Sequence, residues 1–139
     1  MKRRKESDKF IFPKKFRDLV FAALKNYSSV LGLNQWEGTV VFAFKDCVDE
    51  PDTRADMNVD IRYRRATMRI YPKLYRDWIL NGDNEITDVV AHEVCHILTQ
   101  PLANLASNAW KTKQEFHDEW EVLTELISRL AIRLYKHEK

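Results

Sequence analysis

The amino-acid sequence predicts a single α+β domain, and three observations predict it. Apolar residues three and four apart, the spacing of helices, occupy both ends of the chain and a segment near residue 90. β-Branched and alternating stretches, typical of strands, are confined to about residues 39–71. No internal repeat or linker divides the 139 residues, a length that suits one domain with a modest core. The order of helix, strands and further helices is that of an α+β fold.

Residues 1–12 are expected to be a flexible basic tail, and residues 13–139 the folded domain. The basic run at residues 2–5 is more typical of a solubilising end than of a nucleic-acid contact. Pro13 is well placed to begin a helix that ends near Gly32. This helix is expected to pack across the sheet with an apolar face made of Phe16, Leu19, Val20, Ala23, Leu24 and Tyr27.

Three strands are expected after this helix. Residues 39–44 are β-branched and aromatic, which predicts a strand with much of its surface buried. Apolar and polar residues alternate over residues 57–64, the pattern of a half-buried strand. A turn at residues 65–66 would lead to a third strand at residues 67–71. The expected sheet is three-stranded and mostly antiparallel, with the antiparallel pair within residues 56–71.

Three helices complete the predicted fold. Pro72 begins a short helix that Asn81-Gly82 ends. The next helix is expected from Asn84 to Gln100, where Pro101 would stop it. The last long helix is expected over residues 113–136. Its main apolar stripe consists of Phe116, Trp120, Leu123, Ile127, Leu130 and Leu134.

Composition limits the classes of function. Apolar residues make up 45% and charged residues 32%, as in ordinary globular proteins, and the net charge of +2 gives no support of its own for nucleic-acid binding. No apolar run approaches the ~20 residues of a membrane span, and no signal peptide is visible, so no membrane partner is expected. Cys47 and Cys95 make no disulfide framework, which favours a cytoplasmic, reducing location, with Cys95 as a small buried hydrophobe. The oligomeric state is left open.

The segment His92-Glu93-Val94-Cys95-His96 has the pattern His-Glu-x-x-His. Residues four apart share one face of a helix, so His92 and His96 can direct two imidazoles at one metal ion. Glu93 lies beside them, where its carboxylate can hold a metal-bound water. The alternative is two solvated histidines and a surface glutamate. Metal binding is favoured because both histidines project away from the apolar stripe of this helix, which consists of Ile86, Val90, Val94 and Ile97.

A catalytic zinc ion usually takes three protein ligands and keeps one open position. The last predicted helix offers Glu121 and Glu125, four residues apart on a side away from its apolar stripe. One of them can bind the metal while the other orients a ligand histidine. His117 is the competing third ligand. With His117 as the ligand, the two glutamates would form a solvated helix face.

The His-Glu-x-x-His motif and the downstream glutamate helix together resemble the gluzincin class of zinc metallopeptidases, which includes thermolysin. The second motif of that class is Glu-x-x-Ser-Asp, in which Glu binds zinc and Asp supports the first motif histidine. Glu121-Val122-Leu123-Thr124-Glu125 matches it in polarity at each position. The resemblance implies a zincin-like domain that binds Zn²⁺ through His92, His96 and Glu121. It also implies that Glu125 supports His92 and that Glu93 is the general base of a peptidase.

The chain is more similar to the minimal gluzincins than to thermolysin, because it is short and lacks a second subdomain. It resembles the minigluzincins and small phage-type metallopeptidases, in which His-Glu-x-x-His-x-Leu-x-x-Pro-Leu recurs, here over residues 92–102. The resemblance covers roughly residues 39–135 and implies a peptide or protein substrate. It also implies that an edge strand before the motif helix, here residues 67–71, pairs with that substrate. The candidates for the oxyanion donor are His117, Tyr71 and Tyr75, although packing or solvent exposure is the favoured interpretation for each of them.

Other interpretations stay open. A SprT-like, nucleic-acid-associated protease would use His117 as third ligand, and its motif of histidine and aromatic is loosely similar to His117-Asp118-Glu119-Trp120. A non-catalytic zincin-fold protein would keep the metal for binding or regulation. A purely structural site would have four protein ligands. The metzincin pattern is excluded, because Thr99 and Leu102 stand where it needs glycine and histidine.

Overall fold

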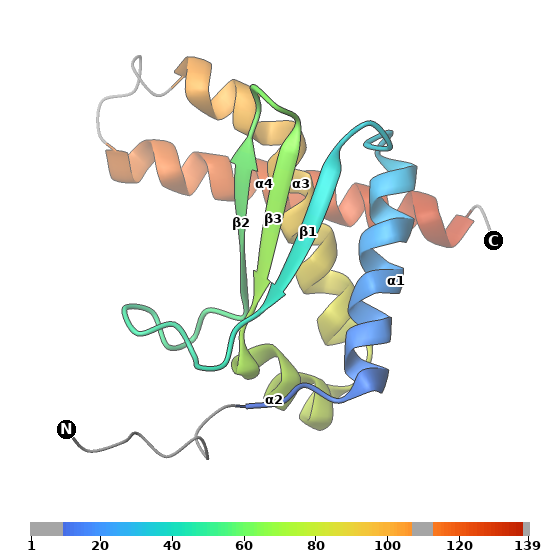
Figure 1. The fold of residues 1–139 in the computed structure, drawn as a ribbon. Coiled ribbons are helices and arrows are strands. Elements are labelled where there is room, and N and C mark those ends of the chain that lie inside the picture. Colours follow the sequence, from blue (N-terminus) through green and yellow to red (C-terminus); the bar gives the residue numbers. More distant parts are fainter. Residues whose placement is uncertain (1–9, 107–112, 138–139) are drawn as a thin grey trace.

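A computed structural model of the protein describes residues 10–106 and 113–137. The elements are, in order, α1 (Lys14–Val30), β1 (Glu37–Phe42), β2 (Ala55–Asp60), β3 (Arg65–Ile70), α2 (Pro72–Asn81), α3 (Asn84–Ala106) and α4 (Lys113–His137). The predicted α+β fold is confirmed. Figure 1 shows α1 beside β1, α3 running behind the sheet, and α4 crossing behind α3. In the described part of the chain, no helix combines the length and hydrophobicity that crossing a membrane requires.

The sheet has the strand order β1-β3-β2. The predicted antiparallel pair is confirmed, with β2 and β3 in register from Ala55 opposite Ile70 to Asp60 opposite Arg65. β1 is parallel to β3, so the sheet is mixed rather than mostly antiparallel. The composition of residues 39–44 indicates a strand but carries no information about its direction. The hairpin turn lies at residues 61–64, where Arg64 has a φ of 51°, and not at residues 65–66 as predicted.

β3 is the central strand of the sheet. The prediction that residues 67–71 form an edge strand that pairs with a substrate is therefore wrong. Residues 67–70 lie within β3 and are hydrogen-bonded to strands on both sides, so this strand has no free edge. β2 pairs with β3 alone and is an edge of the sheet. β2 also packs against α3, the helix that carries the His-Glu-x-x-His motif.

The hydrophobic core lies between the sheet, α1 and α3. Its fully buried members include Phe16, Val20, Met68, Ile70, Leu74, Ile86, Val90 and Val94. The packed body begins before Pro13, because Phe12 is buried and the backbone N–H of Phe10 donates to the carbonyl of Phe44 at 3.4 Å. The predicted tail boundary at residue 12 therefore lies too far along the chain. The basic run at residues 2–5 lies outside the described residues.

Helix α3 continues past the expected stop. Pro101 lies inside α3, which ends at Ala106 instead of Gln100. A proline within a helix removes one backbone hydrogen bond, and packing can offset that cost. Here the turns around Pro101 are buried at Thr99 and Ala103, and α3 packs along α4. Short α2, by contrast, begins and ends where the sequence predicted.

Helix α4 packs on α3 with a face that the apolar pattern did not predict. Its inner face, toward α3, consists of Glu121, Thr124, Glu125, Ser128 and Ala131, and Thr124, Ser128 and Ala131 are buried. Its outer face consists of exposed Val122, Leu123, Leu126, Leu130 and Leu134. The predicted stripe was thus largely wrong as a guide to burial, since Leu130 is 56% exposed and Leu134 48%. Small and polar residues line the inner face, which lets the two helices meet around a polar centre.

Candidate metal centre

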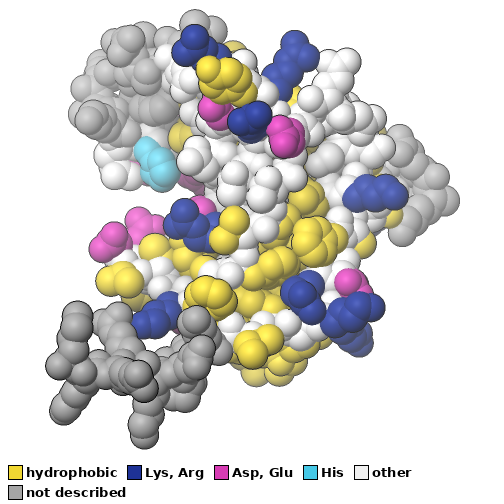
Figure 2. Space-filling model, in the orientation of Figure 1, with side chains coloured by type: hydrophobic (Ala, Val, Ile, Leu, Met, Phe, Trp, Pro, Cys, Tyr) yellow, Lys and Arg dark blue, Asp and Glu magenta, His cyan; other side chains and the backbone are white. Residues whose placement is uncertain are grey.

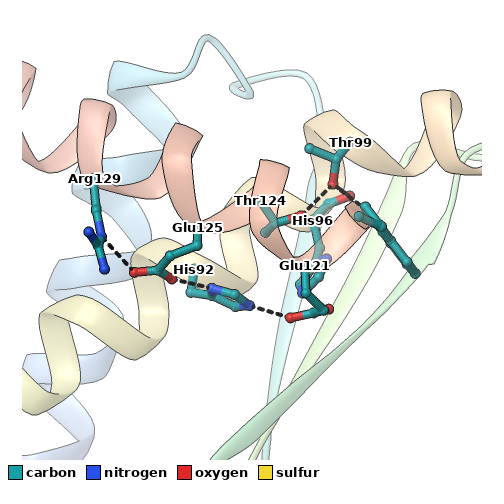
Figure 3. Close-up of polar contacts among 8 residues, drawn as sticks. His92, His96, Thr99, Glu121, Thr124, Glu125 and Arg129 are labelled. Atoms are coloured by element: carbon teal, nitrogen blue, oxygen red, sulfur yellow. Dashed lines mark hydrogen bonds and ion pairs between the residues drawn. The ribbon is translucent and has the colours of Figure 1, made fainter. Parts of the chain in front are cut away.

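The motif histidines meet the glutamates of α4 between the two packed helices (Figure 3). His92 and His96 are four residues apart on α3, and Glu121 and Glu125 are four residues apart on α4, so each pair presents one face to the other helix. His92 Nε2 lies 3.1 Å from Glu121 Oε2, and His96 Nε2 lies 3.4 Å from Glu121 Oε1. One donor atom from each of these three residues lies within 4.8 Å of the other two.

This set of donors fits a zinc ion. Two imidazoles and one carboxylate form a donor set of catalytic zinc sites, which bind at about 2.0–2.1 Å from the metal. One ligand atom from each of His92, His96 and Glu121 lies within 4.8 Å of the other two, so a single metal ion could be held between them. Within residues 10–106 and 113–137, no other group of three such side chains comes together in this way.

Glu125 sets the orientation of His92. Its Oε2 lies 2.8 Å from His92 Nδ1, and Arg129 Nε donates to its other oxygen at 3.1 Å. Figure 3 shows the resulting line from Arg129 through Glu125 and His92 to Glu121. When Nδ1 donates its hydrogen to Glu125, the lone pair of a neutral His92 lies on Nε2 and faces Glu121. When Nε2 loses its proton, the ring is therefore left in the tautomer that a metal ligand needs.

The two histidines differ in charge. The pKa of His92 is raised to about 9, first by its hydrogen bond to Glu121 and further by that to Glu125. Burial lowers the pKa of His96 to about 4. The pKa values of Glu121 and Glu125 are lowered, in each case chiefly by the hydrogen bond to His92. At neutral pH the metal-free site therefore holds a charged His92, a neutral His96 and two carboxylates.

Glu93 lies next to His92 in the wall of a cleft. Its side chain is buried, and burial raises the pKa of its carboxyl to about 8. The cleft has a volume of about 540 Å³ and is lined by residues from the segment before β2, from α3 and from α4, among them Arg54, Glu85, Asp88, Glu93 and Ile132. Figure 2 shows the molecule hollowed on the β2 side, with acidic and basic side chains around the opening.

The other residues singled out from the sequence lie elsewhere. His117 is exposed one turn before Glu121, with its ring 6.3 Å from that of Trp120, and it is not one of the three grouped donors. The Tyr71 hydroxyl donates to Asp56 at 2.7 Å. Tyr75 packs among the aromatic rings near Phe16. Neither tyrosine lines the cleft. Cys95 is buried, as predicted, and burial raises the pKa of its thiol to about 12.

A second polar cluster, which sequence reasoning missed, joins the helices one turn beyond His96. Thr99 Oγ1 accepts a hydrogen bond from Trp120 Nε1 at 2.8 Å. It also contacts Thr124 Oγ1 at 3.1 Å (Figure 3). The Trp120 ring meets His96 edge to face at 5.1 Å. These contacts fix the register of α4 on α3 and hold the His96 ring. The sequence holds one signal for this cluster: Thr99 follows His96 by three residues, and Thr124 follows Glu121 by three, so each threonine lies near the site on its own helix.

The structure thus brings together His92, Glu93, His96, Glu121 and Glu125, and it leaves His117 outside the donor group. No protein-family model matches the chain, and no curated protein or solved structure is significantly similar to it. The chemistry of these side chains is therefore the basis for assigning a function.

Proposed function

We propose that the protein is a zinc-dependent peptidase that hydrolyses peptide bonds with a metal-activated water. The observation that supports this proposal is that His92, His96 and Glu121 each bring a ligand atom within 4.8 Å of the others, beside a buried Glu93. Zinc bound by these three residues would polarise a peptide carbonyl and make its bound water acidic near neutral pH. An arrangement of three protein ligands leaves a position for that water.

Glu93 would act as the general base. Its carboxyl is buried beside His92 in the cleft wall, and burial raises its pKa to about 8. A group with a pKa near the working pH can both take a proton and release it. Glu93 would take the proton of the attacking water and pass it to the amine that leaves. A nearby cation would favour the carboxylate form needed for the first of these steps.

Glu125 and Arg129 would act through His92. The carboxylate of Glu125 accepts from His92 Nδ1, and Arg129 holds the other oxygen of that carboxylate. The pair keeps Nε2 directed at the metal position and raises the basicity of the ligand. Glu125 is thus a positioning residue, while His92, His96 and Glu121 are the ligands.

An extended peptide or protein segment is the proposed substrate. β2 is an edge strand, and Arg54 and Ala55 at its start line the cleft beside Glu93. An edge strand offers unpaired backbone groups with which an extended chain can pair. A peptide paired with β2 could place one side chain in the cleft of about 540 Å³. We place this activity in a reducing, cytoplasmic compartment, since both Cys47 and Cys95 are free.

The proposal is tested by comparing the wild type with Glu93→Gln after both have been loaded with zinc. We expect the wild type to cleave an unfolded protein or a mixed peptide library. Glu93→Gln should keep its zinc and lose at least about 100-fold in kcat/KM, the contribution typical of a general base. Glu37→Gln, at an exposed glutamate of β1, is the matched control and should cleave like the wild type.

Two results would contradict the proposal. A wild type that binds zinc and cleaves no peptide in the library would be a metal-binding protein without this activity. Cleavage that is unchanged in Glu93→Gln would show that another group, or a contaminating enzyme, is responsible. Measuring the zinc content of each preparation separates loss of the metal from loss of the base.

A further inference from the structure

The outer face of α4 is an apolar surface with no partner within the described residues. Val122, Leu123, Leu126, Leu130 and Leu134 are all exposed along this helix. Single exposed leucines are ordinary, but a continuous row of them on one helix face marks an interaction surface. These residues are exposed, whereas the residues of α4 that meet α3 are on its other side, so the row is separate from the metal centre.

The spacing of this row is that of a helix that pairs with another helix. Leu123, Ile127, Leu130 and Leu134 follow one another at alternating intervals of four and three, the heptad spacing of coiled coils. Ile127 is half-buried at the margin of the row, and the three leucines are exposed. Leu126 lies beside them at a flanking position of the same heptads. In a coiled coil, these flanking positions select the partner and its direction.

The charges at the flanking positions are self-complementary. Glu119 lies seven residues before Leu126, and Arg133 lies seven residues after it, so all three share one flanking line. Both charged residues are exposed, and neither has an ion pair among the residues that the structure describes. A second copy of α4 that runs antiparallel, centred near Leu126, places Glu119 of each chain opposite Arg133 of the other. The same pairing places Leu123 of each chain next to Leu130 of the other, with Arg129 directly opposite Leu123. In a parallel copy in register, Glu119 and Arg133 lie two heptads apart and would not pair.

We propose that the protein forms an antiparallel homodimer through the outer faces of α4. The contact has twofold symmetry, with Leu126 near the axis, and so uses the same surface of both chains, as the commonest homodimers do. Burial of the leucines would drive association, while the two Glu119–Arg133 pairs would set the direction. The grouped donors His92, His96 and Glu121 lie on the inner side, so the proposed contact does not use them. The dimer can therefore be tested whether or not the protein is a peptidase.

The test is the mass of the full chain by analytical ultracentrifugation over a series of micromolar concentrations. We expect the wild type to approach twice the 16.5 kDa of one chain. Leu126→Lys places two cations near the axis and should raise the dimer dissociation constant at least about 100-fold. Leu80→Lys, at an exposed leucine of α2, is the matched control and should dimerise like the wild type. Circular dichroism of each variant shows whether its fold is kept.

Reversal of charge tests the direction of the pairing. Glu119→Arg and Arg133→Glu each place like charges opposite one another, and each should weaken the dimer at least about tenfold. The double variant Glu119→Arg/Arg133→Glu restores opposite charges in an antiparallel pair, so it should recover the wild-type dissociation constant. A wild type that stays monomeric would overturn the proposal. The proposal would also be overturned if Leu126→Lys left the dimer dissociation constant unchanged. It would fail as well if the double variant did not recover the wild-type dissociation constant.

Discussion

Helix α4 buries its polar face and exposes its apolar face, which is the reverse of an ordinary surface helix. On the inner face, Thr124, Ser128 and Ala131 are buried against α3, and Glu121 and Glu125 meet the motif histidines. On the outer face, four leucines and a valine are exposed. A surface helix normally buries its apolar stripe and exposes its polar one. In α4 the polar stripe is buried.

The difference shows that the inner face of α4 is built for polar contacts with α3 and that its outer face is built for apolar contacts. The proposed metal centre would need charged and polar groups at fixed positions, with small neighbours that let α3 and α4 approach closely. The buried hydroxyl contact between Thr99 and Thr124 and the pairing of Glu125 with His92 fix polar groups in this way. The apolar residues then have no place against α3 and face outward, where no part of the chain that the structure describes covers them. Hydrophobicity alone therefore does not decide which face a helix buries.

The largest expected effect is on the free energy of unfolding, when a threonine of the inner face is replaced by leucine and a leucine of the outer face by threonine. Thr124→Leu puts a larger side chain into a fully buried position, and such overpacking costs about 1–3 kcal/mol of unfolding free energy. Leu126→Thr is the matched change on the outer face, and it should alter the stability of the monomer by less than about 0.5 kcal/mol. Urea unfolding of both variants in dilute solution measures the difference. Equal losses from the two changes would mean that the faces are not packed as described.

Removal of the charge on Glu125 should have the next largest effect. Glu125→Gln keeps the shape of the side chain but weakens its hold on His92 Nδ1, 2.8 Å away. Loss of such a supporting carboxylate typically costs about 10–100-fold in metal affinity. Competition with a chelator of known affinity measures the change. Glu119→Gln, an exposed glutamate on the same helix, should leave zinc affinity as in the wild type, and an equal loss there would argue against a specific role for Glu125.

The pH dependence of zinc binding should show a smaller, graded effect. The pKa of His92 in the metal-free protein is raised to about 9, so this ligand must lose a proton when the metal binds near neutral pH. His96, with a pKa of about 4, is already neutral. Zinc affinity should therefore rise about tenfold per pH unit between about pH 6 and 8, with release of a proton. A zinc affinity that does not change over this pH range would show that His92 does not lose a proton when zinc binds.

The sequence predicted the residues that meet at the site better than it predicted the packing around them. His92, His96, Glu121 and Glu125 are related by helical spacing within each helix, which local sequence reveals. The choice of Glu121 over His117 as the neighbour of the histidines depends on how α4 is rotated on α3, and the Thr99–Thr124–Trp120 cluster fixes that rotation. Such contacts join residues far apart in the chain and leave no periodic signal.

The errors in the fold have the same physical origin. Pro101 was expected to end α3, but packing of Thr99 and Ala103 keeps the helix intact through it. The direction of β1 and the central position of β3 depend on pairing between distant strands, whereas the local pattern only marks a segment as a strand. The β2–β3 hairpin and the bounds of α2 were predicted because neighbouring residues determine them.

The most direct test of the metal centre is the zinc content of the purified wild type, compared with that of Glu121→Ala and His117→Ala. We expect one zinc per wild-type chain, its loss in Glu121→Ala, and its retention in His117→Ala, because among the described residues Glu121, and not His117, shares the donor group with His92 and His96. Loss of zinc in His117→Ala alone would assign the third ligand to His117. A wild type that binds no zinc would contradict the central claim that the inner face of α4 completes a metal site.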